Sequence, residues 1–258
     1  MPAPALVLLA HGSHDPKVVS VTHAMRKEMQ ECRPTLDVQI AFIDHCPPTG
    51  PQVVSQLARR GVQEIVFVPL EIGSAQEAGA EALAVVEKAR QSHPDIKMIA
   101  SRPIGPEACL LGLVDRRLRE ALSRNHVEQL DALVLSTAGV DEVRSRSLLA
   151  RRGRQWAANH RLPVVVAHAF GAGPNVAEAV LHLRGQGRRH VAVGSWFLTG
   201  DETWYAQATQ AIAAGAVSVS APLGGGPEVR DIAMNRYVVA AMDLLPIGDE
   251  EAAESAAG

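Results

Sequence analysis

An internal repeat runs through nearly the whole chain and limits its possible folds more than any other feature. Four segments of the first half recur in order in the second half: residues 5–12 and 132–139 (ALVLLAHG and ALVLSTAG), 50–53 and 173–176, 65–72 and 191–198, and 102–107 and 221–228. The last pair is followed in each half by a helical arginine, Arg116 or Arg236. A duplication of this period predicts two equivalent domains, residues 1–126 and 127–246.

Each half alternates apolar runs with segments of helical spacing. In the first half, the pattern predicts strands over residues 5–10, 37–43, 64–72 and 96–100. The stretch 64–72 is apolar almost throughout, as expected for a central strand of a parallel sheet. A helix is predicted to open at residues 105–107 and to run to about Arg124. The order predicts an α/β protein of two tandem flavodoxin-like halves, each a mostly parallel four-strand sheet flanked by helices.

Charge and composition exclude several classes of partner. The formal net charge of −3 provides no basic field, so we expect no nucleic acid partner. The three cysteines form no CxxC pair, which suits a reducing cytosol. The chain enters its first strand without a charged leader, and no apolar run approaches the ~20 residues that span a bilayer. We therefore expect a cytoplasmic protein with no membrane partner, and a flexible acidic tail over residues 247–258.

Polar residues follow three predicted strands of the first half. His11 follows the first strand, Asp44 and His45 follow the second, and residues 71–77 follow the third. The carboxyl ends of parallel strands share one edge of a sheet, where an imidazole and carboxylates can converge on one cation or one proton. Such a set suits Fe(II), Co(II) or Ni(II), or general base catalysis. The alternative is that His11 is a turn histidine with satisfied hydrogen bonds and Asp44 a helix cap.

The second half lacks these polar residues. Ala138 stands where the first half has His11, and the apolar residues Ala169 and Phe170 stand where it has Asp44. The predicted site therefore belongs to the N-terminal half.

Taken in order, the segments resemble the CbiX/SirB-type sirohydrochlorin chelatases of the class II chelatase superfamily. The resemblance rests on residues 11–16 (HGSHDP), 41–44 (AFID), 66–70 (VFVPL) and the degenerate duplicate, and covers about 240 residues. It implies insertion of Co(II) or Fe(II) into sirohydrochlorin, on the branch to cobalamin or siroheme. It also implies that a divalent metal and an acidic tetrapyrrole are the substrates, and that no organic cofactor takes part.

The resemblance assigns roles to individual residues. His11 matches the first metal-binding histidine of the family and would be both metal carrier and base. Asp44 stands where the family commonly has a metal-contacting glutamate, and Glu77 occupies the approximate place of the second histidine. The implied metal ligands are His11, Asp44 and Glu77, a set that favours harder ions than two histidines would. Ser13 and His14, the latter in place of an arginine, are the expected substrate contacts.

Three residues of the second half are further candidates for substrate binding. Trp196 belongs to an aromatic group that could line a flat macrocycle, although core packing is the alternative. Arg144 and Arg146 lie on a predicted helix that borders the cleft and could pair with substrate carboxylates, although such a run is usually a solvated helix face.

Two functions fit these observations. The first is a metal chelatase of the lyase class, and the second is a non-catalytic tetrapyrrole- or metal-binding paralogue that acts as a carrier or regulator. A hydrolase is disfavoured because the sequence has no nucleophile elbow. The duplication places two domains in one chain, whereas shorter, single-domain relatives obtain the second domain by pairing with another chain. We therefore expect a monomer.

Overall fold

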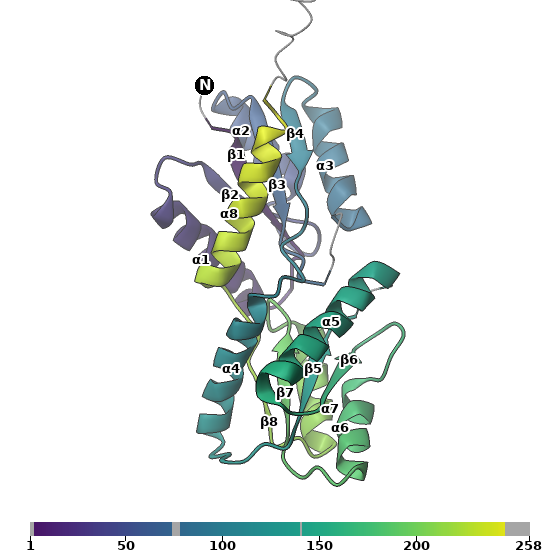
Figure 1. Ribbon diagram of the computed structural model, residues 1–258. Helices are drawn as coiled ribbons and strands as arrows, with labels where there is room; N and C mark the ends of the chain where they lie inside the picture. The colour runs from purple at the N-terminus through teal and green to yellow at the C-terminus, as the bar shows by residue number, and fades with distance from the viewer. Residues whose placement is uncertain (1–2, 74–77, 140, 246–258) are drawn as a thin grey trace, which may run out of the picture.

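Two parallel four-stranded sheets form the framework of the protein, stacked one above the other in Figure 1. The computed structural model describes residues 3–73, 78–139 and 141–245. The first sheet has the order β2-β1-β3-β4 and the second the order β6-β5-β7-β8. The strands are β1 (Ala5–Ala10), β2 (Val38–Phe42), β3 (Glu64–Pro69), β4 (Lys97–Ala100), β5 (Ala132–Thr137), β6 (Val164–His168), β7 (Val191–Trp196) and β8 (Ser218–Val219). The predicted fold class is confirmed, whereas the tail over residues 247–258 lies outside the described residues.

Helices cover both faces of each sheet. They are α1 (Pro16–Cys32), α2 (Gly50–Arg59), α3 (Ala80–Ser92), α4 (Leu110–Arg124), α5 (Val143–His160), α6 (Val176–Gly185), α7 (Glu202–Ala213) and α8 (Pro227–Met242). The start of α1 is fixed by Asp15, whose side chain accepts a hydrogen bond from the backbone N–H of Lys17 at 2.8 Å, and by Pro16 in the first turn.

Helix α4 begins later than the sequence predicts. Its first residue is Leu110, whereas the Gly-Pro pair suggested a start at Gly105. The backbone N–H of Gly105 instead donates to the carbonyl of Glu71 at 3.0 Å. A Cβ atom on Gly105 would lie 2.3 Å from the carbonyl oxygen of Ile72, so the glycine permits this close approach. The contact holds residue 105 against the segment that leaves β3 and keeps it out of the helix.

The last helix of each sequence half packs on the sheet of the other half. Helix α4 lies against β7 and β8, whereas α8 lies against β3 and α1, as Figure 1 shows for the teal and the yellow helix. The division into residues 1–126 and 127–246 stays a prediction, and the two ranges are interlocked in space by this exchange.

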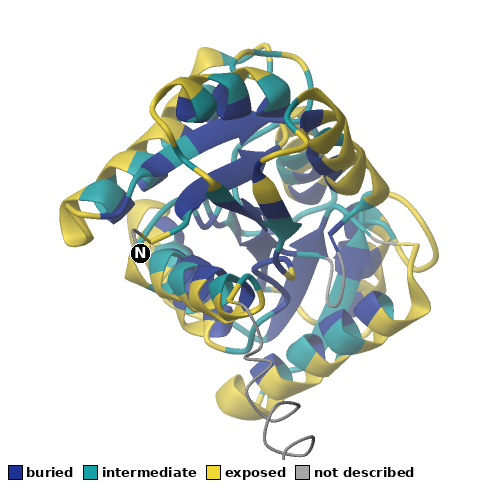
Figure 2. Ribbon diagram, turned by 90° about the horizontal axis from the view of Figure 1, so that it is seen from above, coloured by how far each residue is buried: buried dark blue, intermediate teal, exposed yellow. Residues whose placement is uncertain are grey.

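Strand β1 shows how the core is divided. Leu6, Leu8 and Ala10 point into a buried cluster shared with α1 and α8, and the alternate residues point toward α2 and α3. The first cluster continues into the second half, where it includes Leu133 and Trp156. Figure 2 shows the buried strands enclosed by helices whose outer faces are exposed. One core therefore joins the two halves.

Reciprocal ion pairs accompany the exchange of helices. Arg116 of α4 lies 2.9 Å from the Glu228 carboxylate at the start of α8, and Arg236 of α8 pairs with Glu107, just before α4. These are the Pro-Glu and arginine positions that recur in the sequence. The repeated residues therefore bind across the two halves and not within them.

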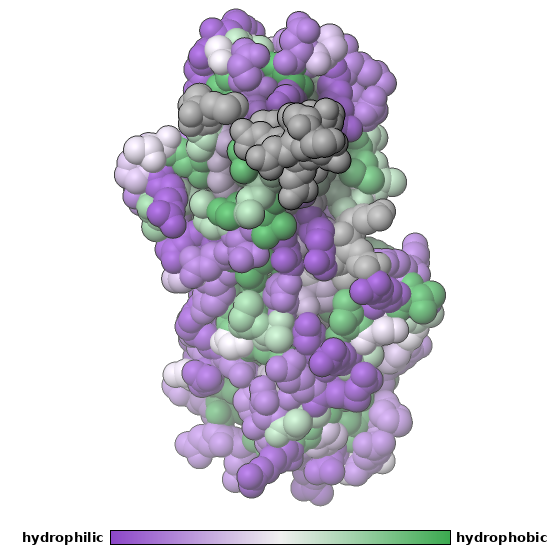
Figure 3. All heavy atoms as spheres, turned by 45° about the horizontal axis from the view of Figure 1, so that its top comes forward, coloured by the Kyte–Doolittle hydropathy of each residue, from purple (hydrophilic) through white to green (hydrophobic). Residues whose placement is uncertain are grey.

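No helix in the described part of the chain is both long enough and apolar enough to cross a bilayer. The surface in Figure 3 is mainly hydrophilic, with apolar patches between the polar side chains. Val238, Val239 and Met242 on α8 are among the exposed apolar residues.

Candidate functional site

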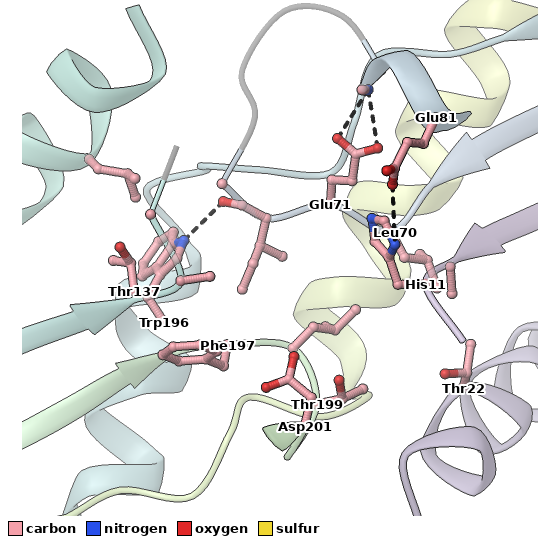
Figure 4. Close-up of a pocket in the computed structure, with 18 of the residues that line it drawn as sticks. His11, Thr22, Leu70, Glu71, Glu81, Thr137, Trp196, Phe197, Thr199 and Asp201 are labelled. Atoms are coloured by element: carbon pink, nitrogen blue, oxygen red, sulfur yellow. Dashed lines mark hydrogen bonds and ion pairs between the residues drawn. The ribbon is translucent and has the colours of Figure 1, made fainter. Parts of the chain in front are cut away.

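A cavity of about 400 Å³ lies between the carboxyl ends of the two sheets. Figure 4 shows its polar groups, with His11, Glu71 and Glu81 on one side and Thr137, Thr199 and Asp201 from the second half. Leu70, Trp196 and Phe197 supply apolar wall. A polar edge and apolar walls contributed by both halves are typical of a small-molecule site.

His11, Asp44 and Glu81 come together at the edge of this cavity. The His11 Nδ1 atom lies 3.4 Å from Asp44 Oδ2 and 3.9 Å from Glu81 Oε2. One ligand atom from each residue lies within 4.8 Å of the others. The side chains are 54%, 36% and 72% exposed for His11, Asp44 and Glu81, so an ion in solution can reach them. One imidazole and two carboxylates are a suitable ligand set for a divalent transition metal.

The loop after β1 holds Asp44 in place. The backbone N–H of Gly12 donates to Asp44 Oδ1 at 2.7 Å, which leaves Oδ2 directed to His11. A Cβ atom at Gly12 would lie 2.1 Å from the Asp44 carbonyl oxygen, so the two strand-end loops can meet this closely only at a glycine. The alternative prediction, that Asp44 caps a helix, is wrong. Helix α2 begins at Gly50, and Thr49 is its N-cap.

Glu81 is the member of the cluster that the sequence pattern does not reveal. It is the second residue of α3, and an acidic residue in a first helical turn is more readily interpreted as complementing the helix dipole. The preceding N-cap, Gly79, is held by Glu71, whose two carboxylate oxygens each accept from the Gly79 N–H at 3.2 Å. Figure 4 shows Glu71 and Glu81 side by side above His11. Glu77, the third predicted ligand, lies outside the described residues.

Ser13 and His14 lie in the turn that leads from His11 into α1. The Ser13 hydroxyl accepts a hydrogen bond from the Asp15 N–H at 3.0 Å. The ring of His14 packs against that of His45, with centroids 4.9 Å apart. Neither residue is among the described residues that line the cavity, so their role in substrate binding stays a prediction.

Trp196 joins the two halves at the floor of the cavity. It is 2% exposed, and its Nε1–H donates to the carbonyl oxygen of Ile72 at 2.9 Å. The dashed line in Figure 4 marks this bond. Trp196 therefore packs in the core, which was the alternative to substrate binding, and it also lines the cavity.

Arg144 and Arg146 lie in the first turn of α5. Arg144 is exposed and Arg146 is half-buried, and the described cavity lining does not include them. Burial, together with the charge of Arg146, lowers the pKa of His168. His168 Nδ1 lies 3.1 Å from the hydroxyl of Thr137, a residue of the cavity wall. Arg146 thus carries a positive charge near the second-half wall, and its contact with substrate stays a prediction.

The equivalent loop of the second half makes the same close approach to its neighbour, although Gly139 has a φ of +107° and no carboxylate in the described part of the chain faces it. A Cβ atom at Gly139 would lie 2.1 Å from the Phe170 carbonyl oxygen, as one at Gly12 would from that of Asp44. The repeat therefore aligns Gly12 with Gly139 and Asp44 with Phe170. Among the described residues the cluster lies in the first half, as the contrast of His11 with Ala138 predicts.

Comparisons with known proteins find similarity to sirohydrochlorin chelatases. The family model described as CbiX matches residues 5–121. A sirohydrochlorin cobaltochelatase of Priestia megaterium is 20% identical over 196 residues, which are 75% of this chain and 64% of the relative. A sirohydrochlorin ferrochelatase of the same organism is 22% identical over 133 residues, 50% of this chain and 49% of the relative. The chain thus spans about half to just under two thirds of the length of these relatives.

A solved structure supports the fold over nearly the entire chain. The structure of SirB from Bacillus subtilis with Fe3+ superposes with a TM-score of 0.76 at 17% identity, covering 93% of this chain and 96% of that one. At this identity the match shows a shared fold. It includes both halves, whereas the family model matches the first half alone.

Proposed function

We propose that this chain is a chelatase of the CbiX/SirB type and that it inserts Co(II) or Fe(II) into sirohydrochlorin, which the CbiX match over residues 5–121 and the similarity to two sirohydrochlorin chelatases support. The observation that carries the proposal is the position of His11, Asp44 and Glu81 within 4.8 Å of one another, with His11 and Glu81 at the edge of the cavity. The names of the two Priestia megaterium relatives support both metals, so the choice between cobalt and iron rests on experiment.

Metal insertion makes two demands that this cluster meets. The ion must be held beside the macrocycle, and two pyrrole N–H groups must each lose a proton as their nitrogens become metal ligands. His11 and the two carboxylates would hold the ion while it exchanges their oxygen and nitrogen atoms for ring nitrogens. The released side chains would then accept the two protons and pass them to water. The ion keeps its charge throughout, so the reaction requires no oxidant or reductant.

We assign to Glu81 the ligand position that the resemblance gave to Glu77. Glu81 Oε2 lies 3.9 Å from His11, and Glu71 holds the helix start that carries it. The mixed set offers more oxygen ligands than two histidines would, which favours harder divalent ions.

The macrocycle would lie in the cavity between the halves. Leu70, Trp196 and Phe197 offer apolar surface to its flat face, and Arg144 and Arg146 are the proposed partners of its carboxylates. Because one chain supplies both walls, we propose a monomer that works in the cytoplasm without an organic cofactor.

A direct assay distinguishes this enzyme from a non-catalytic carrier. The purified protein is mixed with sirohydrochlorin and Co(II), and the change in macrocycle absorbance is followed for the wild type, His11→Ala and His182→Ala. His182 is an exposed histidine of α6 and serves as the matched control. We expect the wild type and His182→Ala to accelerate insertion alike, and His11→Ala to lose roughly 10²-fold or more, as for loss of a general base. Metal binding by the wild type without acceleration over the uncatalysed reaction would instead identify a carrier.

A further inference from the structure

The segment that leaves β3 is held in place by a residue of the second half. The indole Nε1–H of Trp196, the last residue of β7, donates to the carbonyl oxygen of Ile72 at 2.9 Å. The N–H of Gly105 donates to the neighbouring carbonyl, that of Glu71, at 3.0 Å. Residues 71 and 72 are therefore fixed by two groups far from them in the sequence, one of which belongs to the other half.

The side chain of Glu71 connects this segment to the metal cluster. The N–H of Gly79, the N-cap of α3, donates to both Glu71 carboxylate oxygens at 3.2 Å. Glu81 is the second residue of that helix, and its Oε2 atom lies 3.9 Å from His11 Nδ1. Figure 4 shows these contacts, from Trp196 through Glu71 to Glu81 and His11. Two hydrogen bonds thus connect the Trp196 indole to the start of the helix that carries Glu81.

The repeat shows that the bond from Trp196 has no counterpart in the opposite direction. Residues 191–198 correspond to residues 65–72, so Trp196 stands where the first half has Leu70. A leucine side chain has no hydrogen-bond donor. Trp196 is 2% exposed, and a buried indole N–H requires an acceptor, which the Ile72 carbonyl provides. At this position the second half can therefore hold the first, but not the reverse.

The body of α3 is held independently of this connection. Ala82 and Val86 are buried in the core on one side of the first sheet, and the helix packs against α2 and β4. Its first turn has weaker support, because the N-cap Gly79 has no side chain that could cap it. Loss of the Glu71 hydrogen bond should therefore release the turn that carries Glu81 and leave the rest of the helix folded.

We propose that Trp196 and Glu71 are positioning residues for Glu81, through which the second half sets the affinity of the first-half cluster for its divalent cation. Trp196 fixes residues 71 and 72, and the Glu71 carboxylate fixes the turn that carries Glu81. A metal ligand without such support binds less tightly, because it must be ordered when the ion arrives. That Glu81 binds the ion rests on the proposed function.

A double-mutant cycle on Co(II) binding tests the positioning role. Trp196→Phe keeps an aromatic ring and removes the N–H donor, and its Co(II) affinity is measured by calorimetry in the wild-type and Glu81→Ala backgrounds. We expect binding to weaken roughly tenfold in the wild-type background, as for loss of a group that supports a metal ligand, and by less than about twofold in the Glu81→Ala background. A residue that merely stabilises the fold would weaken binding in both.

Trp204→Phe is the matched control. The Trp204 Nε1–H donates to Ser195 Oγ at 2.9 Å, so this variant also loses an indole hydrogen bond, but one that lies within the second half. We expect it to keep the wild-type Co(II) affinity.

Glu71 provides a second test if Trp196→Phe fails to fold, as judged by circular dichroism. Glu71→Gln and Glu71→Ala remove the same charge, but only glutamine keeps an oxygen that can accept from the Gly79 N–H. We expect Glu71→Gln to bind Co(II) roughly tenfold more tightly than Glu71→Ala, and the difference to vanish when Glu81→Ala is added.

The proposal is overturned by equal losses in the two backgrounds, by an equal loss in Trp204→Phe, or by a wild type that binds no Co(II). Its failure is distinguishable from that of the proposed function. A protein whose Co(II) affinity depends on Trp196 as predicted, but which inserts no metal, would refute the chelatase activity and leave the positioning role standing. Metal insertion by the wild type, beside unchanged Co(II) affinity in Trp196→Phe, would do the reverse.

Discussion

At the scale of single residues, two glycines at matching positions of the repeat show which contacts serve the fold and which serve the proposed metal site. Gly12 and Gly139 both let the loop after a central strand touch the loop after its neighbour, at positions where a Cβ atom would lie 2.1 Å from a carbonyl oxygen. Only Gly12 also donates its N–H to a carboxylate, that of Asp44. A methyl group should therefore crowd the loops of both halves, and at Gly139 it also strains a backbone with φ of +107°. It should affect the metal cluster only at Gly12.

We predict that Gly12→Ala lowers the free energy of unfolding by about 1–3 kcal/mol through overpacking, and that Gly139→Ala lowers it by more, because its positive φ adds backbone strain. Gly12→Ala should also weaken Co(II) binding by roughly 10–100-fold, because it displaces a ligand from its supporting hydrogen bond. Gly139→Ala should leave Co(II) affinity at the wild-type value. Urea unfolding and calorimetric titration measure the two effects, and equal losses of affinity in both variants would contradict the assigned roles.

Sequence reasoning could find His11 and Asp44 because each directly follows a strand. Their meeting at 3.4 Å follows from the parallel order of β1 and β2. Glu81 could not be found in this way, because it lies ten or more residues beyond β3 and reaches the site only through the path of the intervening loop. The Gly79–Glu71 hydrogen bond that fixes the start of α3 has no local sequence signal.

At the scale of elements, the exchange of α4 and α8 determines how the halves are held together. The apolar patterns predicted these helices but not their partners, because either sheet offers an equivalent apolar face to either helix. The repeat leaves the ion pairs equally open. The glutamate of each Pro-Glu segment could pair with the arginine of its own half or with that of the other half. The contacts across the halves are settled only by the path of the chain in space.

The ion pair between Arg116 and Glu228 gives this exchange a pH dependence. Its hydrogen bond lowers the pKa of Glu228 below the ordinary value of 4.5. A carboxyl with a lowered folded-state pKa contributes stability above its unfolded pKa and loses it as the pH falls through the folded value. We predict that Glu228→Gln lowers the free energy of unfolding at pH 7 by at most about 1 kcal/mol, because Arg116 is 46% exposed.

At pH 3 the loss of unfolding free energy caused by Glu228→Gln should be clearly smaller than at pH 7. Urea unfolding at both pH values measures it. Glu31→Gln is the control, because the Glu31 carboxylate lies 3.8 Å from Lys27 in an exposed pair within α1. It should change stability by less than about 0.5 kcal/mol at either pH. A Glu228→Gln penalty that is as large at pH 3 as at pH 7 would exclude the charge of Glu228 as its cause.

At the scale of the whole molecule, the two sheets bring different residues to the cavity. The first half contributes the proposed metal ligands, and the second contributes much of the wall that faces them across the cavity. The repeat and its asymmetry could be predicted from the sequence, since His11 has Ala138 as its counterpart. The exact cavity could not be predicted, because it depends on loops and on Trp196, whose indole bonds to Ile72 of the other half.

The central claim is that metal insertion takes place at His11, Asp44 and Glu81. Glu81, which the sequence pattern did not reveal, gives the most direct test. The measurement is the rate of Co(II) insertion into sirohydrochlorin by Glu81→Gln and by Glu87→Gln, an exposed glutamate of the same helix that pairs with Arg90. We predict that Glu81→Gln reduces kcat/KM for Co(II) roughly tenfold or more, as for loss of a metal ligand or proton acceptor, while Glu87→Gln keeps the wild-type value. Equal wild-type rates in both variants would contradict the claim.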